Sequence, residues 1–421
     1  MRLRVLSLRS PKWSTKLPIE KPEDYTPDEA QSIEQELAAA YDSTYGSSEQ
    51  RAAAVAQFNE IKPTIVAVMN ESFSDLSCFE QLQAAGYTGP AFYNSLPDTL
   101  VRGTMLASVT GGGTANSEFE FLTGATTAFV GLGKIPYQLY QMNSVNSLAK
   151  DLKELGYTTT AMHPQNPVNY HRDKNLSAAG FWRLSFNRRF RRCALLPCRR
   201  MRLRHLRQIL DLLRTDEAPQ FIFDVTMQNH GGYDYGTVPA EELTNYWVEG
   251  ASEGANSALN TYLTCINASD RDLEYFINEL RNIGRPVVLV FFGDHQPSAA
   301  TTLNDELYPQ EDTASHAFRI YQSTYFVWAN YEIAGNTELN VYDTVGANEI
   351  AAITLNKIGA PLTDYQKALL ATRSDVPTIN VAGYIGADGL RYDLESEDSP
   401  YASTIDKLQR MQYLEFASKV Q

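Results

Sequence analysis

The pattern that most constrains the fold is a series of short, continuous apolar runs rich in β-branched residues. From Pro63 onward the runs are TIVAVM, YTTTAMH, FIFDVTMQ, PVVLVFFG and STYFVWAN. Helical patterns such as 144–155 and 270–283 lie between them. Strands that are apolar along their whole length are buried on both faces, and helices between such strands cover a parallel sheet. The alternation therefore predicts an α/β fold with a mainly parallel sheet between two helical layers.

The character of the sequence changes on either side of this region. Residues 1–60 form a predicted N-terminal polar arm or linker, with one helix over 28–41 and outside the core. Residues 376–421 contain VPTINVAGYIGADGLRYDL and then a helical stretch, which predicts a small C-terminal α+β subdomain of a hairpin and a helix. We expect the main domain to span 61–375.

Charge and hydropathy exclude two classes of protein. Thirty-six Lys and Arg against fifty Asp and Glu give a net charge of −14, which argues against a general nucleic-acid binder because phosphate neutralisation needs clustered cations. The longest apolar windows, 64–69 and 287–292, fall far short of the ~20 residues that a membrane-spanning helix needs. The N-terminal MRLRVLSLRSPKW has the positive flank of a signal peptide but an apolar run shorter than the about 7–15 residues required. We expect neither a transmembrane segment nor a signal peptide in this chain.

One segment, 183–207, differs from its surroundings because it holds ten arginines and no acidic residue. It can be a basic patch for an anionic membrane surface or polymer, or a solvated basic helix. A third interpretation is a short stretch translated out of frame, since the composition shifts abruptly at Phe181 and ordinary patterning resumes at Gln208. We favour the third interpretation and assign no chemistry to the segment.

Polar residues directly follow four of the predicted strands. Because ligands of open α/β sheets bind at the carboxyl ends of strands, these residues are the candidates for a site. They are Glu71, His163, His230, and the pair Asp294 and His295. Two carboxylates and three imidazoles would thus meet at one edge of the sheet. Mixed oxygen and nitrogen ligands predict a metal site that suits Mn²⁺ or Zn²⁺ better than Ca²⁺.

Three glycines before Thr114 predict a sharp turn, and the spacing of apolar residues after it predicts a helix that begins near Thr114. A threonine there is usually an N-cap, with Asn116 and Ser117 as competing caps. The alternative is a nucleophile, because free N–H groups and the helix dipole stabilise an alkoxide and a phosphoryl group. The candidate metal ligands favour the nucleophile.

In this combination the chain resembles the alkaline phosphatase superfamily, and within it the sulfatase-like branch of lipoteichoic acid synthases and phosphoglycerol transferases. The matching segments are Asn70–Phe73, Gly111–Glu120, Met162–His163, His171–Asp173, Gln228–Gly231 and Phe292–Gln296. They follow the family's order across about residues 60–375. The resemblance implies a three-layer, alkaline-phosphatase-like α/β/α domain.

The resemblance also implies a chemistry. Glu71, Thr114, Asp294 and His295 would hold one divalent metal, Mn²⁺ first, with Mg²⁺ or Zn²⁺ as alternatives. Thr114 would attack phosphatidylglycerol, release diacylglycerol and hold a glycerophosphoryl group until a hydroxyl of a glycolipid or polyglycerol phosphate acceptor takes it. The domain would work at the membrane surface, on the extracytoplasmic face.

Three further residues would line the phosphoglycerol pocket: His163, Arg172 and His230. An arginine offers a fixed fork for phosphate oxygens, and either histidine can move the proton that the transfer requires. The chain departs from the family pattern at Gln165, where an acid is common, and at Tyr170, where the family has Trp.

Other functions stay open. A phosphoethanolamine transferase or a phosphodiesterase uses the same metal and threonine. A true sulfatase needs a C/S-x-P-x-R motif, which neither Cys193 nor Cys198 begins. A non-catalytic binder of anionic glycopolymer is opposed by the complete set of candidate catalytic residues.

Overall fold

The structure is a computed structural model that describes residues 18–186, 199–233, 236 and 238–420. The N-terminal segment with a positive flank, the two cysteines Cys193 and Cys198, and residues 187–198 of the arginine-rich segment lie outside the described residues. Among the helices that are described, none combines the length and apolarity needed to cross a membrane.

An eight-stranded mixed sheet forms the centre of the molecule, in the order β4-β3-β5-β1-β6-β7-β2-β8. The strands are β1 (Thr64–Asn70), β2 (Thr99–Leu106), β3 (Thr158–His163), β4 (Arg183–Phe186), β5 (Gln220–Val225), β6 (Val287–Gly293), β7 (Gln322–Ala329) and β8 (Val341–Gly346). The neighbouring strands β4-β3-β5-β1-β6 are all parallel, as the sequence predicts. β7 runs antiparallel to both of its neighbours, whereas β2 and β8 are parallel to each other.

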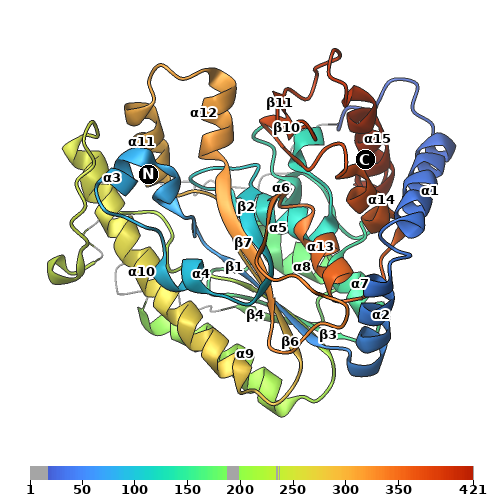
Figure 1. The fold of residues 1–421 in the computed structure, drawn as a ribbon, viewed down its shortest axis with the longest axis horizontal. Coiled ribbons are helices and arrows are strands. Elements are labelled where there is room, and N and C mark those ends of the chain that lie inside the picture. Colours follow the sequence, from blue (N-terminus) through green and yellow to red (C-terminus); the bar gives the residue numbers. More distant parts are fainter. Residues whose placement is uncertain (1–17, 187–198, 234–235, 237, 421) are drawn as a thin grey trace, which may run out of the picture.

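The reversal of β7 follows from its connection to β6. β6 ends at the edge of the sheet where Asp294 and His295 follow it. The next two helices, α11 (Ser298–Leu307) and α12 (Thr313–Ile320), contact each other beyond that edge (Figure 1). The chain therefore enters β7 from the carboxyl end of β6 and runs back beside it. No apolar pattern within STYFVWAN distinguishes this direction from a parallel one, because a buried strand is apolar in either direction.

Helices cover both faces of the sheet, which confirms the predicted α/β/α layers. The remaining helices of at least seven residues are α1 (Pro27–Ser43), α2 (Glu49–Ile61), α5 (Thr114–Thr123), α7 (Leu148–Glu154), α8 (Arg172–Ala178), α9 (Arg199–Thr215), α10 (Glu253–Arg281), α13 (Ile350–Lys357), α14 (Asp364–Thr372) and α15 (Ala402–Gln412). The shorter ones are α3 (Glu80–Ala84), α4 (Ala91–Ser95), α6 (Pro136–Leu139) and α16 (Ser418–Val420). α9 and α10 lie on one side of the sheet in Figure 1, and α1, α14 and α15 on the other.

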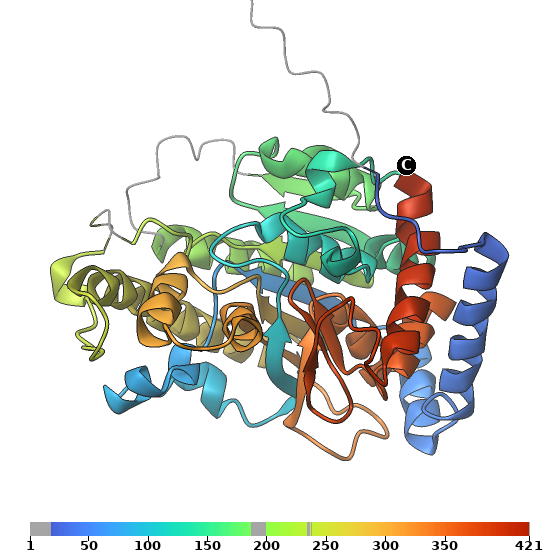
Figure 2. The same ribbon diagram turned by 90° about the horizontal axis from the view of Figure 1, so that it is seen from above.

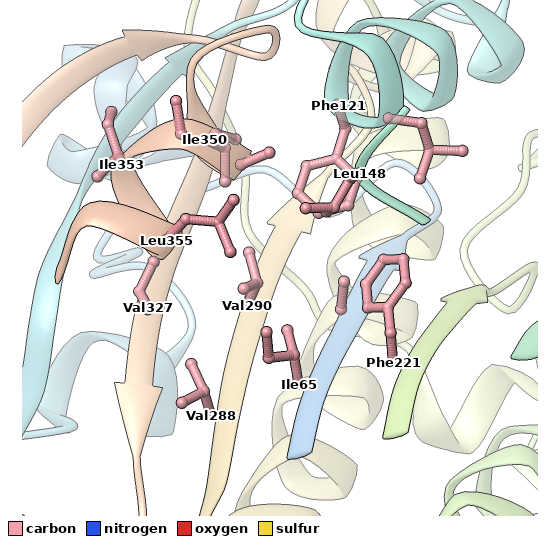
Figure 3. Packing of buried hydrophobic residues seen from close by; sticks show 14 of the residues in the cluster. Ile65, Phe121, Leu148, Phe221, Val288, Val290, Val327, Ile350, Ile353 and Leu355 are labelled. Atoms are coloured by element: carbon pink, nitrogen blue, oxygen red, sulfur yellow. The ribbon is translucent and has the colours of Figure 1, made fainter. Parts of the chain in front are cut away.

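Alternate residues of the central strands supply two separate cores. Ile65 and Val290 point to the face covered by α5, α7 and α13, where they pack near Phe121 (Figure 3). Val66 and Leu289, one position away, belong to the cluster under α9 and α10. Because both faces are buried, each strand is apolar throughout, and this is the pattern that predicts the fold.

The N-terminal region differs from the expectation of one helix outside the core. It forms two helices, α1 and α2, and Tyr41 and Phe58 are each only 2% exposed within the main core cluster. α1 lies beside α15 in both views (Figures 1 and 2) and contacts α14 as well. These few apolar side chains are spaced among Glu, Gln and Ala, so the segment looks polar in sequence. The predicted boundaries near 60 and 375 stay predictions.

A small C-terminal unit follows the main sheet, as predicted. β9 (Thr378–Asn380), β10 (Gly383–Ile385) and β11 (Arg391–Tyr392) form an antiparallel sheet, and α15 continues into a π-helical turn over Tyr413–Ala417.

Both ends of the arginine-rich segment 183–207 are part of this fold. β4 pairs in parallel with β3, and α9 begins at Arg199. Near the end of the segment, the buried His205 places its Nδ1 2.9 Å from Oδ1 of the fully buried Asp224 on β5. This hydrogen bond connects α9 to the sheet. Residues 187–198, the middle of this segment, lie outside the described residues, and the three interpretations of 183–207 stay open.

Candidate active site

The site begins where two neighbouring parallel strands end. β1 and β6 pair with Asn70 opposite Gly293, so the residues that follow them meet directly. Glu71, Asp294 and His295 are each at most 2% exposed, and one ligand atom from each lies within 4.8 Å of the others. The structure therefore brings together the two carboxylates and one of the three imidazoles predicted at this edge.

Backbone amides donate hydrogen bonds to one carboxylate oxygen of Asp294 and leave the other for a ligand. Asp294 Oδ1 accepts hydrogen bonds from the amides of Ser72 at 2.6 Å and His295 at 3.0 Å. Its Oδ2 is buried and accepts no hydrogen bond from any residue that the structure describes. The close approach of the two loops requires the glycine at 293, because a Cβ there would overlap the carbonyl oxygen of Phe73.

His295 supplies a second candidate ligand atom, its Nε2, beside Asp294 Oδ2. Its Nδ1 lies 2.8 Å from the carbonyl oxygen of Gln296, which places the ring proton on Nδ1. Nε2 is then an acceptor, without a donor, 3.1 Å from Asp294 Oδ2. Two buried acceptor atoms that face each other without a hydrogen between them fit a bound cation. Glu71, Asp294 and His295 can hold a metal ion.

The electrostatics of the three residues agree with that assignment. Burial raises the pKa of Glu71, and the neighbouring Asp294 raises it further. Burial lowers the pKa of His295, but Asp294 and Glu71 outweigh it, so the net shift is upward. Both shifts express an excess of negative charge in a buried place, which a divalent cation would compensate.

Thr114 lies at the start of α5 and is not its cap. Gly113, with a positive φ of 86°, is the N-cap residue, and no side chain caps this helix. The competing caps are engaged elsewhere: Asn116 donates to Lys134 O, and Ser117 donates to Asp294 O. The Thr114 hydroxyl instead donates to Glu71 Oε2 at 3.3 Å. This geometry removes the N-cap interpretation and leaves the hydroxyl beside the candidate metal ligands.

A second buried group surrounds Arg172. Its Nε donates to Glu118 Oε2 at 2.9 Å, and its Nη1 donates to His163 Nε2 at 3.2 Å. Burial raises the pKa of Glu118 and Arg172 opposes that shift. Burial and the adjacent guanidinium hold the pKa of His163 well below its usual range. His163 is therefore neutral, with its Nδ1 3.0 Å from Val225 O.

His230 differs from His163 because it is exposed. It follows β5, and its Nδ1 lies 3.3 Å from Gly231 O. A cavity of about 520 Å³ connects it with Glu71, Thr114 and Arg172. Asp294 and His295 are not part of the cavity wall, but they cluster with Glu71, which is. Five of the predicted residues thus line one cavity, and the other two, Asp294 and His295, contact it through Glu71.

Sequence reasoning gave no role to Glu118, which holds Arg172. The available signal is its spacing: four residues after Thr114 on one helix, it lies on the same face. Because it is fully buried and charged, it needs a partner, and the sequence does not identify Arg172, 54 residues away, as that partner.

Comparisons with known proteins agree with the geometry. Residues 63–349 match the family model named Sulfatase. A protein of Rhizobium meliloti (strain 1021), named for cyclic beta-1,2-glucan modification, is 30% identical over 262 residues, covering 60% of this chain and 38% of the relative. The chain spans about two fifths of the length of the curated relatives it matches.

Two solved structures share the fold over nearly the whole chain. The Streptococcus pyogenes phosphoglycerol transferase GacH, in complex with sn-glycerol-1-phosphate, has a TM-score of 0.68 at 22% identity, covering 94% of this chain and 95% of that chain. The Listeria monocytogenes lipoteichoic acid synthase LtaP has a TM-score of 0.59 at 15% identity, covering 90% and 97%. At these identities the likeness establishes the fold alone. With the family match over residues 63–349, it follows that the chain belongs to the sulfatase family and has the fold of the alkaline phosphatase superfamily.

Proposed function

We propose that this chain is a metal-dependent phosphoglycerol transferase, which moves glycerol phosphate from phosphatidylglycerol to a hydroxyl group of a glycolipid or glycan polymer. One observation carries the proposal: the Thr114 hydroxyl bonds to Glu71 in the metal-ligand cluster and shares a cavity with Arg172. A threonine cannot provide the aldehyde that a sulfatase makes from Cys or Ser. The names of GacH, LtaP and the glucan-modifying relative support this choice of donor and acceptor.

The proposed reaction has two balanced halves. In the first, Thr114 Oγ forms a bond to phosphorus, its hydroxyl proton is released to solvent, and the bond from phosphorus to the diacylglycerol oxygen breaks. The leaving oxygen takes a proton from His230. In the second, an acceptor hydroxyl loses its proton to His230 and attacks phosphorus, and the bond to Thr114 Oγ breaks. The Thr114 oxygen then takes up a proton from solvent, and His230 is again protonated for the next cycle.

Glu71, Asp294, His295 and Thr114 would hold one divalent ion, with Mn²⁺ as the first candidate and Mg²⁺ or Zn²⁺ as alternatives. When bound, the ion neutralises phosphoryl charge and lowers the pKa of the coordinated hydroxyl. The protein's own contribution is orientation: the glycine turn at 111–113 places Thr114 beside Glu71, and Gly111 is fixed by donating its amide to Gln296 O at 2.9 Å.

The two histidines then have different roles. Both nitrogens of His163 are engaged, one with Val225 O and one with Arg172, so we assign it to holding Arg172 rather than to proton transfer. His230 is exposed in the cavity, and its Nε2 makes no hydrogen bond within the described part of the chain. We therefore assign the proton transfers to His230 and phosphate binding to Arg172.

The lipid donor would place this domain at a membrane surface, on the extracytoplasmic face that the resemblance implies. No role for nucleic acid is proposed.

The direct test is release of diacylglycerol from fluorescent phosphatidylglycerol by the purified protein with Mn²⁺, with Thr114→Ala as the control. We expect metal-dependent release that Thr114→Ala abolishes. Thr114→Ser, which keeps a hydroxyl, should retain part of the rate. A folded protein that releases no diacylglycerol with any of the three metals, or a Thr114→Ala variant that retains the wild-type rate, would contradict the proposal. A parallel reaction with phosphatidylethanolamine tests the alternative donor.

A further inference from the structure

The part of the cavity wall formed by residues 138–170 is rich in neutral amides. Gln138 comes from α6, and Gln165 and Asn169 come from the connection between β3 and α8. Gln138 and Asn169 are exposed, and neither side chain makes a hydrogen bond to another residue that the structure describes. Gln165 Oε1 accepts only a long bond of 3.4 Å from the Asn166 amide. These amides are therefore available to a ligand.

The same wall has no place for a positively charged head group. Among the described residues that line the cavity, Glu71 is the one carboxylate, and it belongs to the metal-ligand cluster and accepts from Thr114. The aromatic ring of Tyr170 is the other group that can attract an ammonium. Its face is already covered by the Arg172 guanidinium, 5.0 Å from the ring centroid. An ammonium beside that ring would meet the positive charge of Arg172.

Amides match a polyol instead. Each amide group both donates and accepts hydrogen bonds, as a hydroxyl does, whereas an ammonium only donates. A site with hydrogen-bonding groups for a substrate hydroxyl strongly disfavours an analogue that leaves those groups unpaired. The glutamine at 165 is neutral, so it gives this wall no negative charge that could attract an ammonium.

We propose that this amide wall selects a phosphate ester of a neutral polyol, such as glycerol, over one of ethanolamine, and that Gln138 is a specificity-determining residue. The inference rests on the proposed function, because it assumes that the phosphate binds between Arg172 and Thr114. Beyond the proposed function, it assigns recognition of the glycerol portion of the transferred group to the amide wall.

The test is a calorimetric titration of the full chain carrying Thr114→Ala, with Mn²⁺ present, so that binding is measured without turnover. The three probes are inorganic phosphate, sn-glycerol-1-phosphate and phosphoethanolamine. We expect glycerol phosphate to bind about tenfold more tightly than phosphoethanolamine, a difference typical of one or two hydrogen bonds. Adding Gln138→Glu should reduce or invert this ratio, because the new carboxylate pairs with the ammonium. The new charge weakens phosphate binding equally for both esters, so the ratio of the two affinities reports only the change in head-group selectivity.

A matched control introduces the same change outside the cavity: Gln35→Glu, at an exposed position of α1, should leave the ratio unchanged. If inorganic phosphate binds but the two esters bind equally, or if Gln138→Glu leaves the ratio unchanged, this inference is wrong while the proposed function stands. If phosphate itself does not bind to the folded protein, the phosphate site of the proposed function is wrong, and the inference fails with it.

Discussion

At the scale of single residues, the site depends on how Arg172 is held. Arg172 is 2% exposed, and its Nε and Nη1 donate to Glu118 and His163. A fork fixed on one side in this way presents its remaining N–H groups in one orientation. Two substitutions separate the charge of Arg172 from its orientation.

Arg172→Lys keeps the charge and removes the fork. Because lysine has a single ammonium and cannot bond to Glu118, His163 and a phosphate together, we expect kcat/KM for phosphatidylglycerol to fall by about tenfold to a hundredfold, as the loss of a charge-assisted hydrogen bond predicts. Steady-state kinetics measure the change. A rate close to that of the wild type would mean that the phosphate binds elsewhere.

Glu118→Gln removes the charge that compensates Arg172 and leaves the shape nearly unchanged. We expect the affinity for inorganic phosphate to fall by about tenfold, because the guanidinium loses its charge-assisted bond and its fixed orientation. Thermal unfolding and phosphate titration are measured on the same sample. A variant with lower thermal stability but unchanged phosphate affinity would assign Glu118 a purely structural role, and Glu118→Asp should restore part of the affinity.

At the scale of elements, the long helix α10 supports the loop that carries Glu71. Its Tyr262 hydroxyl accepts from the Ser74 amide at 3.1 Å and lies 2.9 Å from Ser72 O and 3.0 Å from Ser74 O. Ser72 has a positive φ of 51°, a conformation that is unfavourable for a non-glycine residue. The contacts from α10 therefore stabilise a strained turn directly after Glu71.

Tyr262→Phe tests that support. Removing the hydroxyl leaves buried backbone groups unpaired, so we expect a loss of stability of about 1–3 kcal/mol and weaker Mn²⁺ binding, although Tyr262 is not itself a candidate ligand. Chemical denaturation and metal titration measure the two effects. Unchanged Mn²⁺ affinity in the folded variant would show that the turn keeps its shape without α10.

The sequence predicts those elements whose signal lies in their own residues. The apolar runs predicted five of the strands and the layers, and the residues that follow four of the runs predicted the cluster of Glu71, Asp294 and His295. The direction of β7 was not predictable, because it depends on the packing of α11 and α12 rather than on the strand's own residues. Nor was the pairing of Arg172 with Glu118, since a buried charge does not specify its partner in sequence.

At the scale of the whole molecule, the N-terminal helix closes a second cavity, of about 230 Å³, against α7, α14 and the C-terminal π-helical turn. The pKa of Glu34 is raised to about 7 and that of Asp151 to about 6, in both cases mainly by burial. The negative charges of Glu415 and Asp364 contribute to the raised pKa of Glu34, and Lys419 partly opposes it. These carboxyl groups prefer to be protonated in the folded state.

This preference predicts a pH dependence of stability. For a carboxyl group whose folded pKa is raised, the folded state binds more protons than the unfolded state between the two pKa values, so stability falls as pH rises from about 4.5 to about 7. Glu34→Gln removes this contribution, and we expect its urea unfolding to be less sensitive to pH across that range. Glu36→Gln, at an exposed position of the same helix, is the control. Equal pH dependence in wild type and Glu34→Gln would contradict the prediction.

The central claim concerns a single bond, from Thr114 Oγ to phosphorus. Its most direct test is peptide mass spectrometry of the protein after a brief reaction with phosphatidylglycerol and Mn²⁺, in the absence of an acceptor and with Thr114→Ala alongside. The account predicts one added glycerophosphoryl group on the peptide that contains Thr114, and none in the variant. Diacylglycerol release that proceeds equally in Thr114→Ala, or an adduct on another residue, would contradict it.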